Sequence, residues 1–471
     1  MNDNLEVIIL AAGLGTRMKS ATIKILHRAA GRPIVDYVLD LAADLSTAPP
    51  VMVVGFQREA VQKAIGIRAR YAVQEEQLGT GHAVLQAAGI LEPAGIAGKR
   101  VLILSGDVPL TRRETLQSLL EEHDRSGNAL TLLTMKPSDP AMYGRIVRDD
   151  SGAVLRIVEA KDASDEERRI DEVNAGIYVF NAEHLFDNLR NLRPENAQKE
   201  YYLTDLLAVI RNAGHRVGAV VANDPIEAVG VNSRGELAQV ESEIQRRVVM
   251  KLMSEGVTFR NPSTVVIDSS VSIGQDTVIY PFVTLEGTTR IGEGCVVEPG
   301  VHLVNVTIGD DVHVKTGTVA EDAIIEDQAS VGPYAHLRPG TQLGRKVKVG
   351  NFVETKKAVF GEGAKASHLS YIGDAEIGAD VNIGAGTITC NYDGVNKHKT
   401  ILEDGVFIGS DTQLVAPVRV GRGAYVGAGS TITRDVPADA LALSRTPQKI
   451  VERWAARKRE ARAREREREK P

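Results

Sequence analysis

The second half of the chain carries long runs in which an aliphatic residue recurs at every sixth position, with small and polar residues between. The runs are Ile273, Ile279, Leu285, Ile291, Val297 and Leu303; Ile325, Val331, Leu337, Leu343 and Val349; and Ile408, Leu414, Val420, Val426 and Ile432. A helix cannot use this period, but six is a multiple of the strand period of two, so each aliphatic side chain can point the same way. Three units would close a coil of about 18 residues, and on the order of nine stacked coils would bury an inner column. The stretch from about Val265 to Ile432 therefore predicts a parallel β-helix, because a β-sandwich would not hold one spacing for so long.

The first half of the chain has a different pattern, in which short apolar segments typical of strands alternate with segments typical of helices. The segments Glu6–Leu10, Val51–Val54 and Val101–Leu104 are typical of strands in a mostly parallel, Rossmann-like sheet. Such sheets bind ligands at the carboxyl ends of their strands. Between the halves, Ser233–Glu255 carries apolar residues at steps of three and four, which predicts an amphipathic connecting helix.

Composition narrows the class of protein. With 471 residues, 43% hydrophobic and 25% charged, the chain has the balance of a soluble protein of more than one domain. A net charge of −6 gives no general signal for nucleic-acid binding. Cys295 and Cys390 are too few for a disulfide framework, so we expect buried or bystander thiols in a reducing compartment, the cytoplasm. We expect no signal peptide and no membrane span. The Arg- and Glu-rich run Lys449–Lys470 could contact acidic lipids or RNA through its basic patches, but its near-neutral mixed charge is more typical of a solvated, frayed helix.

A glycine-rich loop directly follows the first strand. Gly13 and Gly15 would let the backbone approach phosphate oxygens, and Arg17 and Lys24 would add positive charge. The loop is neither a Walker A motif nor a dinucleotide fingerprint, and by itself it could equally be a tight strand-to-helix turn. Asp107 follows another strand, where it could hold a hard cation or simply cap a helix.

Two interruptions of the six-residue step are candidate functional segments in the second half. They are Phe360–Tyr371 and Thr389–Gly405, and the polar composition of the second predicts a loop projecting from the coil. His368 lies in the first and could act as a general base, although a single histidine is often structural. Arg338 and Lys356 could bind a phosphate or belong to a solvated face.

Seven motifs of the first half, in their order, resemble the nucleotidyltransferase domain of the bifunctional UDP-N-acetylglucosamine pyrophosphorylase and glucosamine-1-phosphate N-acetyltransferase family. The motifs are Leu10–Met18 with Lys24, Gln74 with Leu78–Ala83, Gly106–Leu110, Tyr143–Arg145, Glu159 with Lys161–Ala163, Asn174 with Gly176, and Gly230–Asn232. The resemblance implies that Asp107 and Asn232 bind Mg²⁺. It implies a nucleotide and sugar site made by Leu10, Ala11, Ala12, Gly13, Arg17, Lys24, Gln74, Gly79, Thr80, Ser105, Gly106, Asp107, Gly144, Glu159, Asn174 and Asn232. The chain departs from the family at Ile23, Ser105 and Ala160, where proline, an aromatic residue and histidine are usual.

The second half resembles the acetyltransferase part of the same family. The matching runs are Leu337–Gly340, Gly350–Glu354 with Lys356 and Lys357, His368–Tyr371, Gly373–Gly378, Val381–Gly394, Gly409–Gln413, and Ser444 with Arg445. The resemblance implies that His368 is the general base and that acetyl transfer is direct, without an acyl-enzyme. It implies an acceptor site of Arg338, Lys356, Tyr371 and Asn382, and an acetyl-CoA site of Ala385, Asn391, Tyr392, Ser410, Ala428 and Arg445. It also implies a homotrimer with acetyl sites between subunits.

We therefore predict an α/β nucleotidyltransferase domain followed by a left-handed parallel β-helix of hexapeptide repeats. The expected boundaries are 1–232 for uridylyl transfer, 233–255 for a linker helix, 256–447 for acetyl transfer and 448–471 for a charged tail. The enzyme would acetylate glucosamine 1-phosphate with acetyl-CoA and transfer UMP from UTP to N-acetylglucosamine 1-phosphate. Its product would supply peptidoglycan and lipopolysaccharide synthesis.

Two alternatives would have to be separated from this prediction by assay. A uridylyltransferase with a regulatory β-helix would release no CoA thiol, and a non-enzymatic scaffold would bind UTP without releasing pyrophosphate. A β-helix carbonic anhydrase would need clustered histidines, and the spacing of His302, His313, His336, His368 and His398 does not predict zinc ligands.

Overall fold

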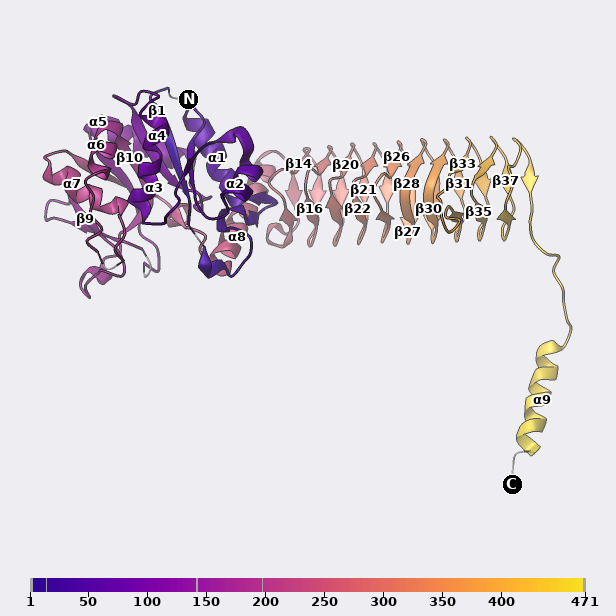
Figure 1. Cartoon of the computed structure of the whole chain (residues 1–471). Coiled ribbons are helices and arrows are strands. Elements are labelled where there is room, and N and C mark those ends of the chain that lie inside the picture. Colours follow the sequence, from indigo (N-terminus) through magenta and orange to yellow (C-terminus); the bar gives the residue numbers. More distant parts are fainter. Residues whose placement is uncertain (1–2, 14, 141–142, 197, 469–471) are drawn as a thin grey trace. The chain divides into compact units, whose positions relative to one another are not determined.

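The chain contains two compact units in the computed structural model, which describes residues 3–13, 15–140, 143–196 and 198–468 (Figure 1). One unit comprises Met1–Lys251 with Val266–Ser270, and the other comprises Leu252–Val265 with Val271–Pro471. Leu14, in the predicted nucleotide loop, and the end of the charged tail, 469–471, lie outside the described residues.

The first unit is built on a nine-stranded sheet with two strands off its main path. Along the path the strands are β11 (Val217–Val221), β7 (Leu130–Met135), β10 (Val173–Asn181), β6 (Arg100–Ser105), β1 (Leu5–Ala11), β4 (Val51–Val54) and β5 (Arg70–Val73). β6, β1, β4 and β5 are parallel to one another and β7 is parallel to β11, whereas β10 is antiparallel to both β6 and β7. β8 (Arg145–Arg148) and β9 (Val154–Val158) form an antiparallel pair beside this path. The mostly parallel sheet and its three predicted strands are confirmed.

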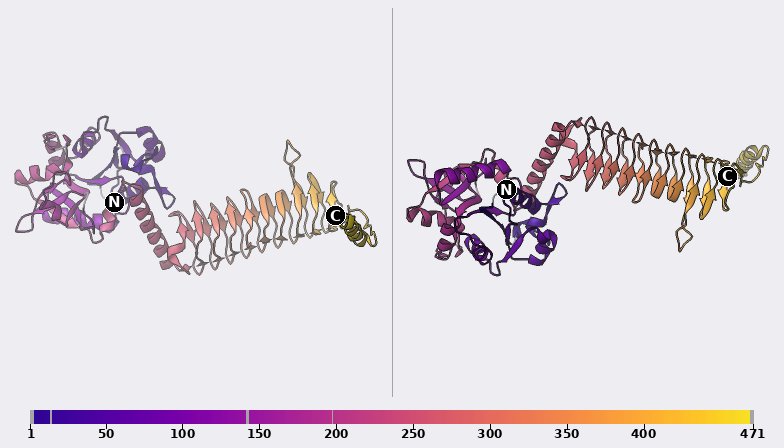
Figure 2. Two further views of the ribbon diagram at one scale, coloured as in Figure 1. Left: turned by 90° about the horizontal axis from the view of Figure 1, so that it is seen from below. Right: turned by 90° about the horizontal axis from the view of Figure 1, so that it is seen from above.

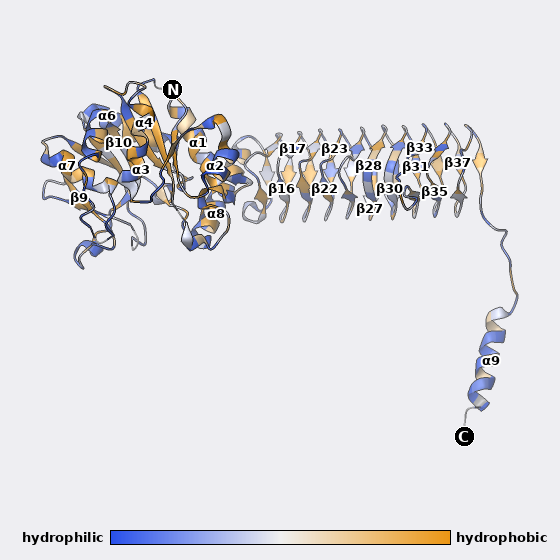
Figure 3. Cartoon of the chain, viewed as in Figure 1, coloured by the Kyte–Doolittle hydropathy of each residue, from blue (hydrophilic) through white to orange (hydrophobic). Residues whose placement is uncertain are grey.

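Helices cover both faces of this sheet, and the strands between them are the most hydrophobic part of the unit (Figure 3). One face packs against α1 (Ile34–Leu45), α2 (Arg58–Ile65) and α5 (Arg113–Ser126). The other packs against α3 (Thr80–Gln86), α4 (Ala88–Leu91), α6 (Ala182–Leu189) and α7 (Leu206–Asn212). Because the strands are buried on both faces, ligands can reach the sheet only at its ends.

The predicted connecting helix is α8 (Arg234–Ser254). Its residues Val240 and Ile244 are buried with Met18, Leu110 and Val231, which border the loops at the carboxyl end of the sheet. α8 is therefore more than a spacer, because it packs against the segments that carry the predicted metal ligands.

The chain from β12 (Thr258–Phe259) onwards forms a left-handed parallel β-helix, as the six-residue step predicts. One sheet has eleven strands: β12 (Thr258–Phe259), β15 (Val278–Ile279), β18 (Val296–Val297), β21 (His313–Val314), β24 (Ser330–Val331), β27 (Lys348–Asn351), β29 (Lys365–His368), β31 (Asn382–Ile383), β34 (Phe407–Ile408), β37 (Tyr425–Val426) and β39 (Leu441–Ala442). The other has seventeen: β13 (Val266–Ile267), β14 (Ser272–Ile273), β16 (Thr284–Glu286), β17 (Arg290–Ile291), β19 (His302–Val304), β20 (Thr307–Ile308), β22 (Val319–Glu321), β23 (Ile324–Ile325), β25 (His336–Leu337), β26 (Gln342–Leu343), β28 (Glu354–Phe360), β30 (Tyr371–Ile377), β32 (Ile388–Cys390), β33 (Thr400–Leu402), β35 (Gln413–Val415), β36 (Val418–Val420) and β38 (Thr431–Ile432).

Aliphatic side chains stack inside the β-helix from coil to coil. On the eleven-stranded sheet the buried column is Ile279, Val297, Val314, Val331, Val349, Ala366, Ile383, Ile408 and Val426. Each fully buried aliphatic side chain contributes about 1.5–3 kcal/mol. Burial of this inner column is therefore a main source of the stability of the β-helix.

The two predicted interruptions behave differently. The first expectation was wrong: β28, β29 and β30 continue the coil through residues 360–371, and the step was hidden because alanine occupies the inner position at Ala366. The second is confirmed, since the chain after Cys390 leaves the coil and Tyr392 bridges antiparallel to Lys397 (Figure 2).

The charged tail contains the exposed helix α9 (Trp454–Arg468). Seven of its side chains are basic and three are acidic, so the expectation of near-neutral charge was wrong for this helix. None of the helices in the described part of the chain combines the length and apolar character needed to cross a membrane.

Candidate functional site

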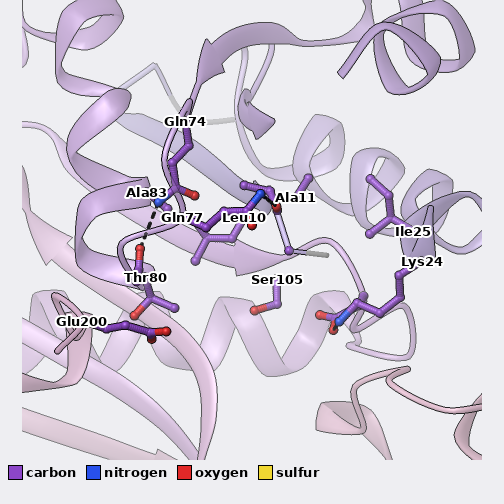
Figure 4. A pocket seen from close by; sticks show the side chains of 14 residues that line it. Leu10, Ala11, Lys24, Ile25, Gln74, Gln77, Thr80, Ala83, Ser105 and Glu200 are labelled. Atoms are coloured by element: carbon purple, nitrogen blue, oxygen red, sulfur yellow. Dashed lines mark hydrogen bonds and ion pairs between the residues drawn. The ribbon is translucent and has the colours of Figure 1, made fainter. Parts of the chain in front are cut away.

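A cavity of about 450 Å³ lies at the carboxyl ends of β1, β5 and β6 (Figure 4). Ten of the predicted residues line it: Leu10, Ala11, Ala12, Gly13, Lys24, Gln74, Gly79, Thr80, Ser105 and Asp107. The parallel register places Leu10 beside Ser105, and the Gly106 N–H donates to the Leu10 carbonyl at 2.9 Å. The glycine-rich loop and the Asp107 loop therefore start side by side.

Three side chains from distant parts of the chain meet at one edge of this cavity. The Lys24 ammonium donates to Asp107 Oδ2 and, at 3.0 Å, to Asn232 Oδ1. The Val231 N–H donates to the Asp107 carbonyl at 2.8 Å, which ties the two segments together. Carboxylate and amide oxygens are ligands that Mg²⁺ accepts, so this cluster has the chemistry of a cation site.

His368 ends strand β29 in the second unit, and its side chain is exposed. Its ring Nδ1 lies 2.6 Å from Oδ1 of Asn351, which occupies the paired position on β27. An amide oxygen only accepts, so His368 Nδ1 carries the proton and donates. His368 Nε2 is then the nitrogen with a free lone pair, as a general base requires.

Cations gather on the seventeen-stranded sheet of the same unit. Arg338 donates to Glu354 at 2.8 Å. Lys356 lies beside Lys397, and the neighbouring Lys397 lowers the pKa of Lys356, with a smaller effect from Arg338. Such a group of like charges is a natural binding place for a phosphate.

The sequence matches three family models: nucleotidyl transferase over residues 6–226, GMPPB C-terminal domain over 262–358, and bacterial transferase hexapeptide (six repeats) over 399–434. It is 53% identical to the bifunctional protein GlmU of Pelobacter propionicus, an alignment that covers 97% of this chain and 99% of the relative. The GlmU of Trichlorobacter lovleyi is 54% identical, with 96% of this chain and 98% of the relative covered. The GlmU of Geobacter sulfurreducens is 50% identical over 97% of this chain and the whole of the relative.

The chain belongs to the bifunctional GlmU family. It is accordingly an acetyltransferase and a uridylyltransferase of UDP-N-acetylglucosamine synthesis, as the motifs predict.

Four lining residues that sequence reasoning missed complete the cavity of this GlmU family member. Gln77 donates to the Ala12 carbonyl at 3.2 Å, and its position between Gln74 and the Leu78–Ala83 run was a usable signal. Glu200 enters from a loop whose Tyr201 N–H donates to the Leu78 carbonyl at 2.8 Å, and nothing in the local pattern indicated it. Ile25 and Ala83 line the cavity as well.

Gly144, Glu159 and Asn174 lie together but do not line this cavity. The Asn174 N–H donates to the Gly144 carbonyl at 2.8 Å, and a Cβ at Gly144 would come within 3.5 Å of a Glu159 carboxylate oxygen. Burial raises the pKa of Glu159, which also accepts from Thr204 at 3.1 Å. Glu159 lines a second cavity, of about 590 Å³.

Two residues of the glycine-rich loop and its continuation bear on the resemblance to the family. The side chain of Arg17, on a short 3-10 helix (Thr16–Met18), is exposed and does not line the cavity. Ile23, which stands where proline is usual, has a φ of −58°. That value is within the range that a proline ring imposes, so the backbone leading to Lys24 keeps the same course.

A buried glutamate fastens the Asn232 segment to the Asp107 loop. The Glu227 carboxylate, 2% exposed, accepts from the Arg112 N–H at 3.2 Å and from Thr115 Oγ1 at 2.5 Å. The Thr111 hydroxyl donates to the Glu227 carbonyl at 3.0 Å. Sequence reasoning missed this contact because its partners lie more than a hundred residues apart.

Three of the predicted acetyl-CoA residues stack on successive coils. The Asp411 N–H donates to the Ala385 carbonyl at 2.7 Å, and the Gly429 N–H donates to the Ser410 carbonyl at 2.9 Å, which brings Ala385, Ser410 and Ala428 into one column. Arg445 donates to the Ala428 carbonyl at 2.9 Å.

The remaining predicted residues belong to three other places. Asn391 donates to Asp374, and a Cβ at Gly373 would come within 2.9 Å of Asn391 Nδ2 and 2.5 Å of the Tyr371 hydroxyl. Tyr392 is exposed on the projecting loop. Asn382 pairs with Lys365 on the eleven-stranded sheet.

Proposed function

We propose that residues 1–232 catalyse uridylyl transfer, that 256–447 catalyse acetyl transfer, and that 233–255 join them. The convergence of Lys24, Asp107 and Asn232 at the edge of a cavity lined by ten predicted residues carries the first assignment. Gln74, Gly79 and Thr80 would hold the uracil side, and Gly144, Glu159 and Asn174 the sugar. We place both reactions in the cytoplasm, where the free thiols of Cys295 and Cys390 would stay reduced.

The residues at this edge fit a magnesium ion. Asp107 and Asn232 direct two oxygens at one cationic group, and Mg²⁺ usually takes one or two protein oxygens and completes its shell with phosphate and water. Bound there, Mg²⁺ would neutralise charge on the triphosphate.

The protein's part in uridylyl transfer would be alignment. An oxygen of the sugar phosphate forms a bond to the α-phosphorus of UTP, the bond to the β-phosphate bridging oxygen breaks, and pyrophosphate leaves. This needs no protein nucleophile, so positioned cations such as Lys24 account for most of the catalysis.

In the β-helix, His368 would act as the general base for acetyl transfer. Its Nε2 accepts a proton as the sugar amine attacks the thioester carbonyl, and the thiol of CoA leaves with a proton returned to its sulfur. Asn351 would hold the required tautomer through its contact at 2.6 Å. Neither cysteine is needed, and burial raises the pKa of both thiols.

The acceptor's phosphate would bind among Arg338, Lys356 and Lys397. An anion there would relieve the repulsion that lowers the pKa of Lys356. Lys397 extends the predicted set, since the projecting loop brings it to Lys356.

A trimer is our proposal for how the acetyl site closes. His368 ends a strand of one sheet, whereas Arg338 directly follows a strand of the other sheet and Lys356 lies within one. The faces of a three-sided coil point apart. Beside Asn351 and His368 runs an exposed apolar edge: the rings of Tyr334 and Phe352 stack at 5.7 Å, and Leu369 follows with 62% exposure. A second copy of this chain would cover that edge and bring further site residues to His368.

The function is tested by incubating the protein with glucosamine 1-phosphate, acetyl-CoA, UTP and Mg²⁺ and omitting each in turn. We expect N-acetylglucosamine 1-phosphate without UTP, and UDP-N-acetylglucosamine only with all four, identified by mass. For the trimer, Phe352→Asp should lower the mass measured by light scattering and abolish acetyl transfer, while Ile67→Asp, at a 98% exposed position of the first unit, should change neither. An unchanged mass for Phe352→Asp would refute the proposed interface.

A further inference from the structure

Lys24 sits where a metal ion held by Asp107 and Asn232 would sit. Its ammonium contacts the oxygens of both residues, and the side chains of Lys24 and Asp107 are only 15% and 17% exposed. The amide of Asn232 is oriented for this contact, because its Nδ2 donates to the Gly230 carbonyl at 3.2 Å and leaves Oδ1 facing the cation. The site thus already holds one positive charge.

We infer that Lys24 and the divalent cation occupy this position in turn. The ammonium neutralises Asp107 before substrate arrives, the incoming ion displaces it, and the released ammonium then binds the phosphates of the nucleotide. The inference rests on the proposed function in taking Asp107 and Asn232 as the metal ligands.

Two physical reasons favour an exchange over joint occupancy. A carboxylate this poorly exposed is costly without a cation, so removing the ammonium alone would be unfavourable. An ammonium and a divalent ion sharing the same two oxygens would repel each other at close range. The exchange therefore needs another anionic partner for Lys24, and the triphosphate provides one.

Lys24 is also able to move. Its ammonium is carried on a flexible four-carbon stem, and Lys24 lines the same cavity as Ser105 (Figure 4). Gly15 packs closely against the base of the stem, since a Cβ at Gly15 would come within 2.8 Å of Lys24 Cβ. The end of the side chain can thus relocate without a change in the loop.

The exchange makes metal and nucleotide binding cooperative. Without nucleotide, a metal ion must compete with Lys24, so its affinity is low. With nucleotide bound, Lys24 has a new partner and the competition ends. By linkage, each ligand strengthens the other by the same factor.

The test measures Mn²⁺ binding to the full chain without nucleotide, by electron paramagnetic resonance of the free ion. Lys24→Met keeps the length of the stem but removes the competing charge, and we expect it to bind Mn²⁺ at least about tenfold more tightly than the natural protein, or about 1.4 kcal/mol. Lys24→Arg retains the charge and should bind as weakly as the natural protein. Lys19→Met, at an exposed lysine of the same loop, is the matched control and should change nothing.

The outcomes separate the inference from the proposed function. If Lys24→Met binds Mn²⁺ no more tightly while Asp107→Asn loses binding, the metal site stands and the exchange is refuted. If Asp107→Asn binds Mn²⁺ as the natural protein does, the proposed metal site is refuted as well. Circular dichroism of each variant establishes that it is folded.

Discussion

Replacement of His368 by alanine should separate the two activities. The side chain is exposed, and its hydrogen bond in the described structure is to Asn351, a contact worth about 0.5–1.5 kcal/mol. The β-helix should therefore stay folded. A positioned general base contributes about 100- to 10,000-fold, so the barrier to acetyl transfer should rise by about 3–5 kcal/mol.

Uridylyl transfer in the same variant should hardly change. His368 and Asp107 belong to different units and share no hydrogen-bond partner among the described contacts. Independent sites couple by no more than about 0.5 kcal/mol, which is about twofold in rate. Asp107→Asn should give the reverse pattern, with pyrophosphate release falling and acetyl transfer kept.

Both rates are measured on one preparation of each variant. CoA thiol is detected with a disulfide reagent when acetyl-CoA and glucosamine 1-phosphate are supplied. Pyrophosphate is followed with UTP, N-acetylglucosamine 1-phosphate and Mg²⁺. His302→Ala is the matched control, because this histidine pairs with Glu286 on a distant coil and should affect neither rate. A folded His368→Ala that keeps acetyl transfer within tenfold, or loses both activities together, would refute the assignment.

Three further predictions use the same assays or a melting experiment. Glu227→Ala leaves the Arg112 N–H and the Thr115 hydroxyl without their acceptor, so the rate of uridylyl transfer should fall about tenfold or more and the Mg²⁺ concentration that it requires should rise. Glu227→Gln should recover part of the lost rate. An unchanged Mg²⁺ requirement in Glu227→Ala would contradict the role of Glu227 in holding the Asn232 segment against the Asp107 loop. Gly373→Ala places a Cβ 2.5 Å from the Tyr371 hydroxyl and should lower acetyl transfer alone, whereas an equal loss of uridylyl transfer would argue against a local effect. Hydrogen bonds from Arg246 and, to a smaller extent, from Arg247 lower the pKa of Glu243 from 4.5 to about 2. Because the pKa is lower in the folded state than in the unfolded state, the ionised Glu243 stabilises the folded protein above pH 4.5, and this stabilisation is lost as the pH falls towards 2. The melting temperature of Glu243→Gln should therefore lie below that of the natural protein at pH 7, by an amount that corresponds to a loss of about 3 kcal/mol in the free energy of unfolding. The difference in melting temperature should narrow below pH 4.5. A difference that does not depend on pH would show that the ion pairs are not its cause.

The sequence by itself determined both folds and most of the residues around the first cavity. A six-residue step points every sixth side chain the same way, so the sequence alone places Ile279, Val297 and Val331 inside the β-helix. The strand that precedes the glycine-rich loop placed that loop at the carboxyl end of a parallel sheet. These inferences hold because they depend on local periodicity and on short motifs.

Only the tertiary structure decided which side chains meet across the chain. Asn351 lies beside His368, 17 residues away in the chain, because the six-residue step shortens between Thr355 and Phe360. A repeat of six does not state where such a shortening falls. Lys397 reaches Lys356 through a loop with no hydrophobic pattern, and Lys24 reaches Asn232 across more than two hundred residues. Hydrophobic periodicity states which way a side chain points, whereas these contacts depend on how distant segments pack.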